Sequence, residues 1–482
     1  MKKTLFIILA GFFTLFFCGQ CSKKDAANNN PVDNPDTTAA TNDMELWVTA
    51  PNQSAFIKKQ NVVLSFKSTT AGSPVIDVDS SVSYQTVDGF GFTLTGGSAT
   101  LIHNMEANAR ATLLQELFGS GSSSIRVSYL RVSIGASDLS ASAFSYDDMQ
   151  AGQTDPGLSQ FSLGPDLVDL VPVLQEILAI NPDIKILGSP WSAPVWMKTN
   201  GSTIGGSLQT QYYDLYAQYF VKYIQAMQSH GITIHAITVQ NEPQHDGNNP
   251  SMLMSSSEQA SFVKSALGPA FQNAGLTTKI IIWDHNCDHP EYPINILNDP
   301  DARAYVDGSA FHLYAGDISA LTSVHNAYPD KNIYFTEQWT SAGGTFDGDL
   351  QWHIKNVIIG SMRNWSKLAM EWNLANDPTY GPHTPGGCTE CKGALTISGS
   401  GITKNVAYYI IGQISKFVWA GSLRISSTNV SGLPNVAFKR TDGKKVMVVL
   451  NDSNASKTFY IRYKGKYVQT TLNAGNVGTY IW

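Results

Sequence analysis

Apolar runs of strand length alternate with helix-like patterns over most of the chain, from about residue 86 to residue 420. Short apolar runs bounded by turn residues indicate buried strands, and apolar positions that recur every three or four residues indicate helices. Eight strand-like runs centre on residues 89–94, 125–132, 184–187, 234–239, 280–283, 310–313, 333–335 and 368–372. This alternation predicts an α/β fold, with a (β/α)8 TIM barrel over residues 86–420.

The clearest helical pattern runs from residue 209 to residue 230. Its large apolar side chains recur at helical spacing, and Gly231 follows as a candidate C-cap. We expect this stripe, which includes Tyr216, Phe220 and Tyr223, to face the core rather than a ligand. The last helix of the barrel is predicted over residues 406–419.

Outside the barrel, both ends of the chain have alternating patterns that are typical of strands. The expected strands lie at 45–55 and 61–68 before the barrel and at 423–426, 436–440, 445–451, 458–462 and 478–482 after it. The first segment alone has too few strands to form a separate domain. We therefore predict one β-sandwich side domain that is formed by both chain ends, from residues 45–85 and 421–482.

The amino terminus has the pattern of an export signal. Lys2 and Lys3 precede an apolar stretch at 5–17 that is too short for a comfortable membrane span, and polar residues follow Cys21 at once. This pattern resembles a bacterial lipoprotein signal peptide at 1–21, with Cys21 as the lipidated residue. Ordinary cleavage and secretion is the alternative. Residues 22–44 are poor in apolar side chains and predict a disordered linker. We expect an exported lipoprotein, attached to a membrane by its lipid, at the outer membrane, the cell surface or in the periplasm.

Composition narrows the class of protein. The net charge of -6 argues against nucleic-acid binding. Aromatic residues make up 11% of the chain, including 10 tryptophans, which suits stacking on sugar rings but also a large core. The 5 cysteines are too few for a disulfide scaffold. We expect a monomer.

Two glutamates follow hydrophobic runs among amide and aromatic residues. Glu242 lies in Gln240-Asn241-Glu242-Pro243 after the predicted fourth strand, and Glu337 lies in Thr336-Glu337-Gln338-Trp339 after the seventh. The carboxyl ends of barrel strands form the active-site face, so both carboxylates should meet there. Two such carboxylates indicate glycoside hydrolysis, and a retaining enzyme uses one as general acid/base and one as nucleophile. We expect a raised pKa for Glu242 and an ionised Glu337.

Further polar and aromatic residues close the predicted strands. Arg131 could hold Glu337 anionic, or it could pair with Asp138 structurally. His312 and Tyr314 could orient Glu337, although a histidine satisfied within the core is the alternative. Aromatic residues at strand ends converge on a barrel mouth. Trp191 and Trp372 are such aromatic residues, and the amide of Asn241 can bond a sugar hydroxyl next to the scissile bond.

Two segments contain metal-ligand residue types without the spacing of a metal site. The stretch 283–289 lacks the spaced partners of a zinc site, so Asp284 and His285 are interpreted as rim residues that touch sugar hydroxyls. Cys388 and Cys391 form a single CxxC, which in an exported protein favours a loop disulfide over zinc. We therefore expect neither a metal nor a cofactor.

With these residues in place, the chain resembles glycoside hydrolase family 30, which includes glucosylceramidases and β-1,6-glucanases. The motifs that carry the resemblance are 88–91, 131–138, 189–191, 196–201, 240–243, 312–314, 336–337 and 372–374. The resemblance implies a barrel with a side β-sandwich, Glu242 as acid/base and Glu337 as nucleophile. It also implies that seven substrate-binding residues surround the first sugar: Arg131, Asp138, Trp191, Asn241, His312, Tyr314 and Trp372. The loops at 244–254, 381–383 and 386–388 are closer to the β-1,6-glucanase branch.

The leading hypothesis is a retaining endo-β-1,6-glucanase that acts on a β-glucan. A β-glucosidase or glucosylceramidase with the same two glutamates is the enzymatic alternative. A catalytically silent glycan-binding lipoprotein is the alternative from another class, and the presence of both Glu242 and Glu337 argues against it.

Overall fold

The computed structural model describes residues 41–68 and 72–482. The predicted signal peptide, Cys21 and most of the predicted linker lie outside the described residues. Residues 42–44 do not behave as a linker, because Met44 is buried and the Asn42 side chain accepts a hydrogen bond from the Leu64 backbone at 3.0 Å. In the described ranges, no helix has both the length and the apolar character needed to cross a membrane.

Eight parallel strands form a closed barrel, in the order β10-β12-β4-β5-β6-β7-β8-β9. The fold prediction is therefore confirmed. The strands are β4 (Gly89–Thr93), β5 (Tyr129–Ile134), β6 (Lys185–Pro190), β7 (Ala236–Thr238), β8 (Lys279–Cys287), β9 (Val306–Gly316), β10 (Asn332–Glu337) and β12 (Ser366–Asn373). The second strand begins at Tyr129 rather than near residue 125, and Arg126 just before it has a φ of 58°, which is outside the range of a strand.

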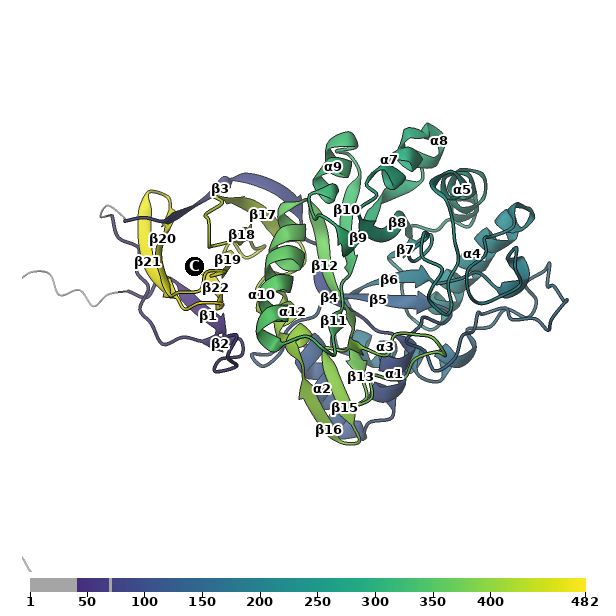
Figure 1. Ribbon diagram of the computed structural model, residues 1–482, viewed down its shortest axis with the longest axis horizontal. Helices are drawn as coiled ribbons and strands as arrows, with labels where there is room; N and C mark the ends of the chain where they lie inside the picture. Colours follow the sequence, from purple (N-terminus) through teal and green to yellow (C-terminus); the bar gives the residue numbers. More distant parts are fainter. Residues whose placement is uncertain (1–40, 69–71) are drawn as a thin grey trace, which may run out of the picture. The chain divides into compact units, whose positions relative to one another are not determined.

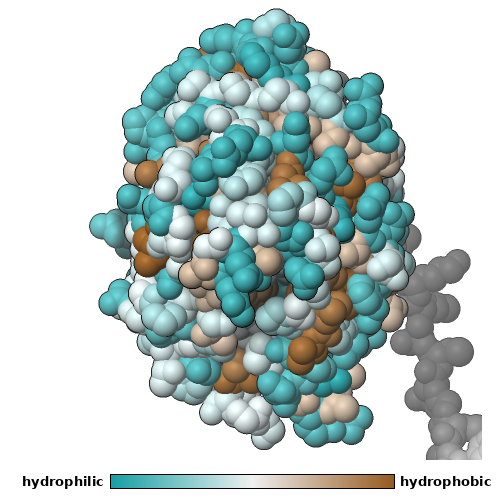
Figure 2. Space-filling view, turned by 90° about the vertical axis from the view of Figure 1, so that its right-hand side faces the viewer, coloured by the Kyte–Doolittle hydropathy of each residue, from teal (hydrophilic) through white to brown (hydrophobic). Residues whose placement is uncertain are grey.

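Helices surround the barrel (Figure 1). They are α1 (Gly96–His103), α2 (Ala107–Phe118), α3 (Leu170–Ile180), α4 (Tyr213–Ser229), α5 (Ser256–Phe262), α6 (Gly268–Asn273), α7 (Glu291–Asn298), α8 (Pro300–Arg303), α9 (Ala320–Ala327), α10 (Phe346–His353), α11 (Ser361–Arg363) and α12 (Val406–Ser415). On α4, Tyr216, Phe220 and Tyr223 have no exposed surface, so the stripe on this helix is core as expected. The face in Figure 2 is mainly hydrophilic, because amphipathic helices turn their apolar sides inward.

A second sheet of nine strands has the order β2-β1-β22-β19-β18-β17-β3-β20-β21. Its strands are β1 (Glu45–Thr49), β2 (Lys58–Lys59), β3 (Val75–Thr86), β17 (Leu423–Ser427), β18 (Asn435–Lys439), β19 (Lys445–Leu450), β20 (Lys457–Tyr463), β21 (Lys466–Leu472) and β22 (Val477–Ile481). Because β1 pairs with β22 and β3 pairs with β17, both chain ends build this domain as predicted (Figure 1). The expected strand at 61–68 is wrong, since that segment makes only an isolated bridge from Lys67 to Tyr467. The long strand β3 takes its place in the sheet.

Gln413, a residue of α12, links this helix to the second sheet. The Gln413 side chain is fully buried, accepts a hydrogen bond from Thr49 at 2.6 Å and donates one to Thr479 at 2.9 Å. One buried amide therefore contacts both ends of the chain. Because an unpaired buried amide is costly, this contact fixes the sheet against α12.

Short strands and a disulfide lie beyond β10 and β12. The strands are β11 (Thr340–Ser341), β13 (Ala375–Asn376), β14 (Cys391–Lys392), β15 (Leu395–Ser398) and β16 (Gly401–Lys404). Cys388 and Cys391 are bonded, with an S–S distance of 2.09 Å. Because β14 pairs with β11, which begins three residues after Glu337, this loop lies close to the seventh barrel strand.

Candidate active site

The two glutamates meet at the carboxyl ends of the barrel strands. Glu337 is the last residue of β10, whereas Glu242 lies four residues beyond the end of β7. The backbone N–H of Glu242 donates to the Asp284 carbonyl at 3.0 Å, which ties the loop after β7 to β8. One carboxylate oxygen of Glu242 lies within 4.8 Å of one oxygen of Glu337. This separation suits a retaining glycosidase, in which the carboxyl groups are roughly 5 to 5.5 Å apart.

Arg131 is the centre of the network beneath the glutamates, and its side chain is fully buried. Its guanidinium donates to Glu337 at 2.5 Å, to Asn241 at 2.5 Å and to Asp284 at 2.9 Å. Arg131 therefore supports Glu337, and the alternative of a structural pair with Asp138 does not occur. The Arg131 guanidinium also lies 4.7 Å from the ring centre of Trp191, a cation–π distance.

The interpretation of Asp284 as a rim residue is wrong. Its side chain has no exposed surface, and its oxygens accept hydrogen bonds from Arg131, Thr336 and His312. Burial alone would raise the pKa of Asp284, but the Arg131 charge and these hydrogen bonds hold it far below its usual range. A carboxylate this deep cannot touch a sugar, so it positions the residues above it.

The His312 ring lies between the carboxylates of Glu242 and Asp284, whereas the sequence predicted a contact with Glu337. Its Nδ1 lies 3.2 Å from a Glu242 oxygen and its Nε2 lies 3.1 Å from an Asp284 oxygen, whereas Glu337 is 3.9 Å away. Burial lowers the pKa of His312, but the negative charges of Glu337, Asp284 and Glu242 raise it to about 9. His312 is thus an imidazolium that donates through both nitrogens.

Glu242, His312 and Glu337 also offer three ligand atoms within 4.8 Å of one another. A metal would need a lone pair on one imidazole nitrogen, yet both nitrogens of His312 face carboxylates. The Arg131 guanidinium already occupies one oxygen of Glu337. The cluster is therefore better suited to holding protons than to holding a cation.

The pKa directions of the two glutamates in the unliganded site are the reverse of those expected. Burial raises the pKa of Glu242, but the hydrogen bond and charge of His312 more than offset it, so the pKa lies below its usual range. Burial, together with the negative charges of Glu242 and Asp284, raises the pKa of Glu337 despite the charges of His312 and Arg131. The reversal arises because His312 lies against Glu242 rather than Glu337. Carboxylates this close titrate as a pair.

A cavity of about 150 Å³ opens over the two glutamates. Its lining is Asp138, Trp191, Glu242, Asn248, Tyr314, Glu337, Trp339, Trp372, Cys388 and Cys391. The Tyr314 hydroxyl donates to Glu337 at 2.9 Å, and the rings of Trp191 and Trp372 lie 5.4 Å apart. The cavity therefore combines aromatic walls with polar groups, as sugar sites do.

Asp138 lies on the wall of this cavity and is 5% exposed. The Cys388 backbone N–H donates to it at 3.3 Å. Burial and the nearby charge of Glu337 raise the pKa of Asp138 to about 7. A carboxyl group that is partly protonated near neutral pH can both donate to and accept from a sugar hydroxyl.

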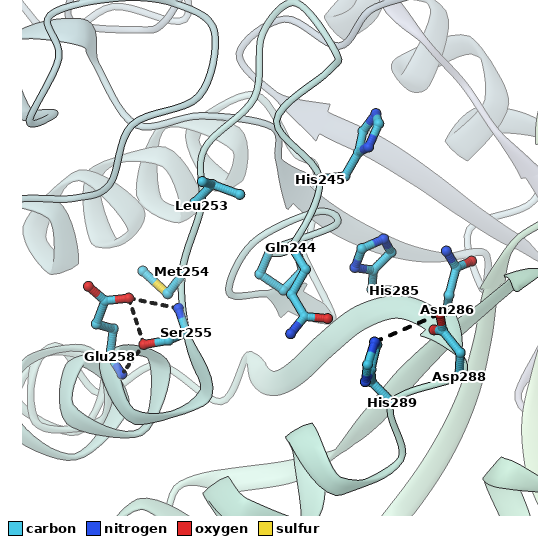
Figure 3. A pocket seen from close by; sticks show the side chains of 11 residues that line it. Gln244, His245, Leu253, Met254, Ser255, Glu258, His285, Asn286, Asp288 and His289 are labelled. Atoms are coloured by element: carbon cyan, nitrogen blue, oxygen red, sulfur yellow. Dashed lines mark hydrogen bonds and ion pairs between the residues drawn. The ribbon is translucent and has the colours of Figure 1, made fainter. Parts of the chain in front are cut away.

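Five of the nine expected substrate-binding residues do not line the cavity, since Arg131 and His312 belong to the buried network described above and three more have other positions. Asn241 does not line the cavity, because its amide oxygen accepts from Arg131. Asp284 lies below the site. His285 borders a neighbouring hollow beside Glu242 (Figure 3).

The sequence reasoning missed Trp339 and Asn248. Trp339 follows Glu337 by two residues, so its position next to a candidate nucleophile was an available signal. Asn248 donates to Glu242 at 3.3 Å from an irregular loop, and no periodic pattern marks it.

The sequence matches two family domains. Residues 87–418 match the glycosyl hydrolase family 30 TIM-barrel domain, and residues 421–480 match the glycosyl hydrolase family 30 beta sandwich domain. Together these matches span the barrel and the carboxy-terminal strands of the second sheet.

Curated relatives and solved structures agree with this match. The chain is 37% identical over 403 residues to endo-1,6-beta-D-glucanase neg1 of Aspergillus fumigatus, covering 78% of this chain and 80% of the relative. It is 28% identical over 428 residues to lysosomal acid glucosylceramidase of Mus musculus, covering 83% and 81%. The solved structure of the endo-beta1,6-glucanase BT3312 aligns with a TM-score of 0.85 and 35% identity, over 91% of this chain and 99% of that one.

Proposed function

Because the chain belongs to glycosyl hydrolase family 30, we propose that it is a retaining glycoside hydrolase that cleaves internal bonds of a β-1,6-glucan. The observation that carries the proposal is the approach of the Glu242 and Glu337 carboxylates within 4.8 Å at the barrel mouth. The linkage rests on the relatives of higher identity, which bear endo-1,6-beta-glucanase names, whereas the glucosylceramidase is less similar.

In the first step, a Glu337 oxygen bonds to the anomeric carbon as the bond from that carbon to the leaving oxygen breaks. Glu242 transfers its proton to the leaving oxygen. In the second step, Glu242 takes a proton from water, and the water oxygen displaces Glu337 from the anomeric carbon. Two inversions retain the configuration, and the two carboxyl groups supply the chemistry without a cofactor.

This cycle requires negative charge on Glu337 and a proton on Glu242. Glu337 accepts hydrogen bonds from Arg131 at 2.5 Å and Tyr314 at 2.9 Å, and both stabilise its anion. The contacts of Glu242 with His312 and Asn248 are longer, at 3.2 and 3.3 Å. We infer that a bound sugar assigns the proton of the coupled pair to Glu242, because the developing cationic anomeric carbon favours the Glu337 anion.

Product sizing over time on a β-1,6-glucan such as pustulan tests this proposal. We expect oligosaccharides of mixed length at early times, with the released β-anomer detected by proton NMR before mutarotation. Glucose or a single disaccharide from the start would contradict internal cleavage.

The alternatives give different results. Turnover of glucosylceramide and gentiobiose, with little on pustulan, would support the glucosylceramidase or β-glucosidase alternative. Binding without turnover on a wide panel of β-glycosides would support a silent glycan-binding protein.

We also propose that the protein is exported as a monomeric lipoprotein that is anchored through Cys21. The amino-terminal pattern supports the export and the anchor. Replacing Cys21 with Ser should abolish labelling by a radioactive fatty acid and move the enzyme from the membrane fraction to the soluble fraction. Unchanged fractionation of Cys21→Ser would contradict the anchor.

A further inference from the structure

A buried aspartate lies in the segment between β5 and α3. Asp147 is 1% exposed, and neither oxygen of its carboxylate has a hydrogen-bond partner among residues 41–68 and 72–482. Other buried carboxylates differ from it, since Asp166 and Asp284 accept hydrogen bonds from neighbouring side chains. A buried carboxylate without a partner is costly, so Asp147 points to a ligand that the protein itself does not supply.

A second carboxylate, that of Asp155, lies next to Asp147. Asp155 is 6% exposed and accepts hydrogen bonds from the Gln160 backbone N–H at 2.6 Å and from the Ser159 hydroxyl at 3.1 Å. These bonds hold the pKa of Asp155 below its usual range. Burial and the charge of Asp155 raise the pKa of Asp147 to about 6. Near pH 7, therefore, two ionised carboxylates face each other.

The positive charge near this pair balances it only in part. Lys222 lowers the pKa of Asp147, but its effect is smaller than those of burial and of Asp155. The Lys222 ammonium lies 5.9 Å from the ring centre of Phe161. Asp148, the next residue in the chain, adds a further negative charge that raises the pKa of Asp147. A bound cation would remove this excess of negative charge.

Packing and hydrogen bonds fix the backbone around Asp147. Its carbonyl accepts a hydrogen bond from the Trp196 indole N–H at 2.9 Å. The backbone N–H of Tyr146 donates to the Tyr219 hydroxyl on α4 at 3.0 Å. The pair of carboxylates is thus a formed feature of the same segment that carries Asp138 to the cavity wall.

We propose that Asp147 and Asp155 bind a calcium ion. Calcium takes roughly six to eight oxygen ligands from carboxylates, carbonyls and water, in geometries that tolerate irregular loops. Both carboxylates supply oxygen alone, which favours a hard cation over zinc or copper. Its double charge matches the two carboxylates. The inference goes beyond the proposed function and does not depend on it.

Thermal unfolding of the purified protein tests the site. After treatment with EDTA and dialysis, about 10 mM calcium exceeds the dissociation constants of roughly 0.1 to 1 mM that are typical of extracellular calcium modules. Calcium should raise the Tm of wild type by about 2 to 3 °C, measured by scanning calorimetry. Sodium chloride at the same ionic strength should leave the Tm unchanged. A wild-type Tm that does not respond to calcium would overturn the proposal.

Matched variants locate the effect. Asp147→Asn keeps the shape of the side chain and should abolish the response to calcium. Without calcium it should unfold no earlier than EDTA-treated wild type, because one of two adjacent charges is gone. Asp155→Asn is the second variant. The control is Asp148→Asn, whose exposed carboxylate accepts from Ser145 and which should keep the response. A full response in Asp147→Asn and Asp155→Asn would overturn the proposal.

Terbium, which replaces calcium at oxygen sites, provides a direct measurement of binding. Because Trp196 contacts the backbone of Asp147, terbium emission excited through tryptophan should lose most of its intensity in Trp196→Phe. Calcium should displace the terbium. Trp339→Phe, beside Glu337, should keep the emission. Emission that is lost in Trp339→Phe and kept in Trp196→Phe would place the ion at the two glutamates and overturn the proposal.

A shared proton is the other way to relieve the pair, and it gives a different result. In that case the Tm of wild type would rise as the pH falls from about 7 to about 5, this rise would be absent in Asp147→Asn, and calcium would have no effect. This combination would replace the calcium site by a hydrogen bond between Asp147 and Asp155.

Discussion

Beneath the two glutamates, Arg131, Asp284 and His312 have no exposed side-chain surface, whereas the hollow beside Glu242 is lined by exposed side chains such as Gln244. In the buried network every charged group contacts an opposite charge. Removing one partner there leaves an uncompensated buried charge, which costs about 3 to 5 kcal/mol. An exposed side chain such as Gln244 carries no charge and remains in contact with water, so its replacement leaves no buried charge without a partner. We therefore expect larger effects on activity from substitutions in the network than from substitutions in the hollow.

The largest effect is expected at Glu337, which the network supports from below. Glu337→Gln keeps the shape of the side chain but removes the attacking carboxylate, so kcat should fall by about 10⁴-fold or more. The measurement is turnover of pustulan and of 2,4-dinitrophenyl β-glucoside. Activity within tenfold of wild type on either substrate would show that Glu337 is not the nucleophile.

Glu242 lies between the network and the hollow, and its replacement should have a substrate-dependent effect. Glu242→Gln should lower kcat on glucan by about 10² to 10⁴-fold, because the leaving oxygen loses its proton donor. Formation of the glycosyl-enzyme from the dinitrophenyl glucoside should persist, since that leaving group needs no proton. Azide should restore turnover and give a product of retained configuration. An inverted glycosyl azide would exclude the acid/base role.

Replacing Arg131 tests the electrostatic part of the network. The Arg131 charge lowers the pKa of Glu337, so Arg131→Met should raise the acidic limb of the bell-shaped kcat/KM profile by about one pH unit or more. The two limbs belong to the coupled glutamate pair. Arg126→Met, near Trp419, is a control that should leave the limb in place. An unmoved limb in folded Arg131→Met would contradict electrostatic support of the nucleophile.

His312 makes stability depend on pH. Its folded pKa of about 9 is above the ordinary value of 6.5, so its contribution is complete below about pH 6.5 and is lost as pH rises through 9. The free energy of unfolding should fall by roughly 3 kcal/mol between pH 6 and pH 10, at about 1.4 kcal/mol for each pKa unit. Urea titrations at several pH values measure it. His312→Gln should lack this slope, and an identical slope in the variant would contradict the prediction.

The smallest effect is expected at the disulfide loop on the cavity wall. Cys388→Ser with Cys391→Ser opens a very short loop, which should reduce the free energy of unfolding by about 2 kcal/mol at most. We expect kcat/KM on glucan to fall only a few-fold, because the Cys388 backbone still reaches Asp138. A loss of more than 100-fold in kcat/KM would contradict this prediction and would show that activity depends on the disulfide as strongly as on the buried network.

The barrel and both glutamates could be predicted from the sequence because their signals are local. An apolar run that ends in a carboxylate places Glu337 at the end of β10 whatever lies across the barrel. The same logic located Glu242, although the strand ends four residues earlier than the glutamate. The prediction of a strand at 61–68 was wrong because the apolar pattern there does not correspond to burial, since Val62 and Val63 are exposed.

Only the tertiary structure decided which charges meet. Arg131 contacts Glu337 across 206 residues of sequence, and His312 contacts Glu242 across 70. The burial of Asp284, the reversed pKa directions of the two glutamates and the hollow beside Glu242 all depend on such contacts. Periodicity reports whether a side chain faces inward, but the energy of a buried charge depends on the partners that other strands bring within about 4 Å.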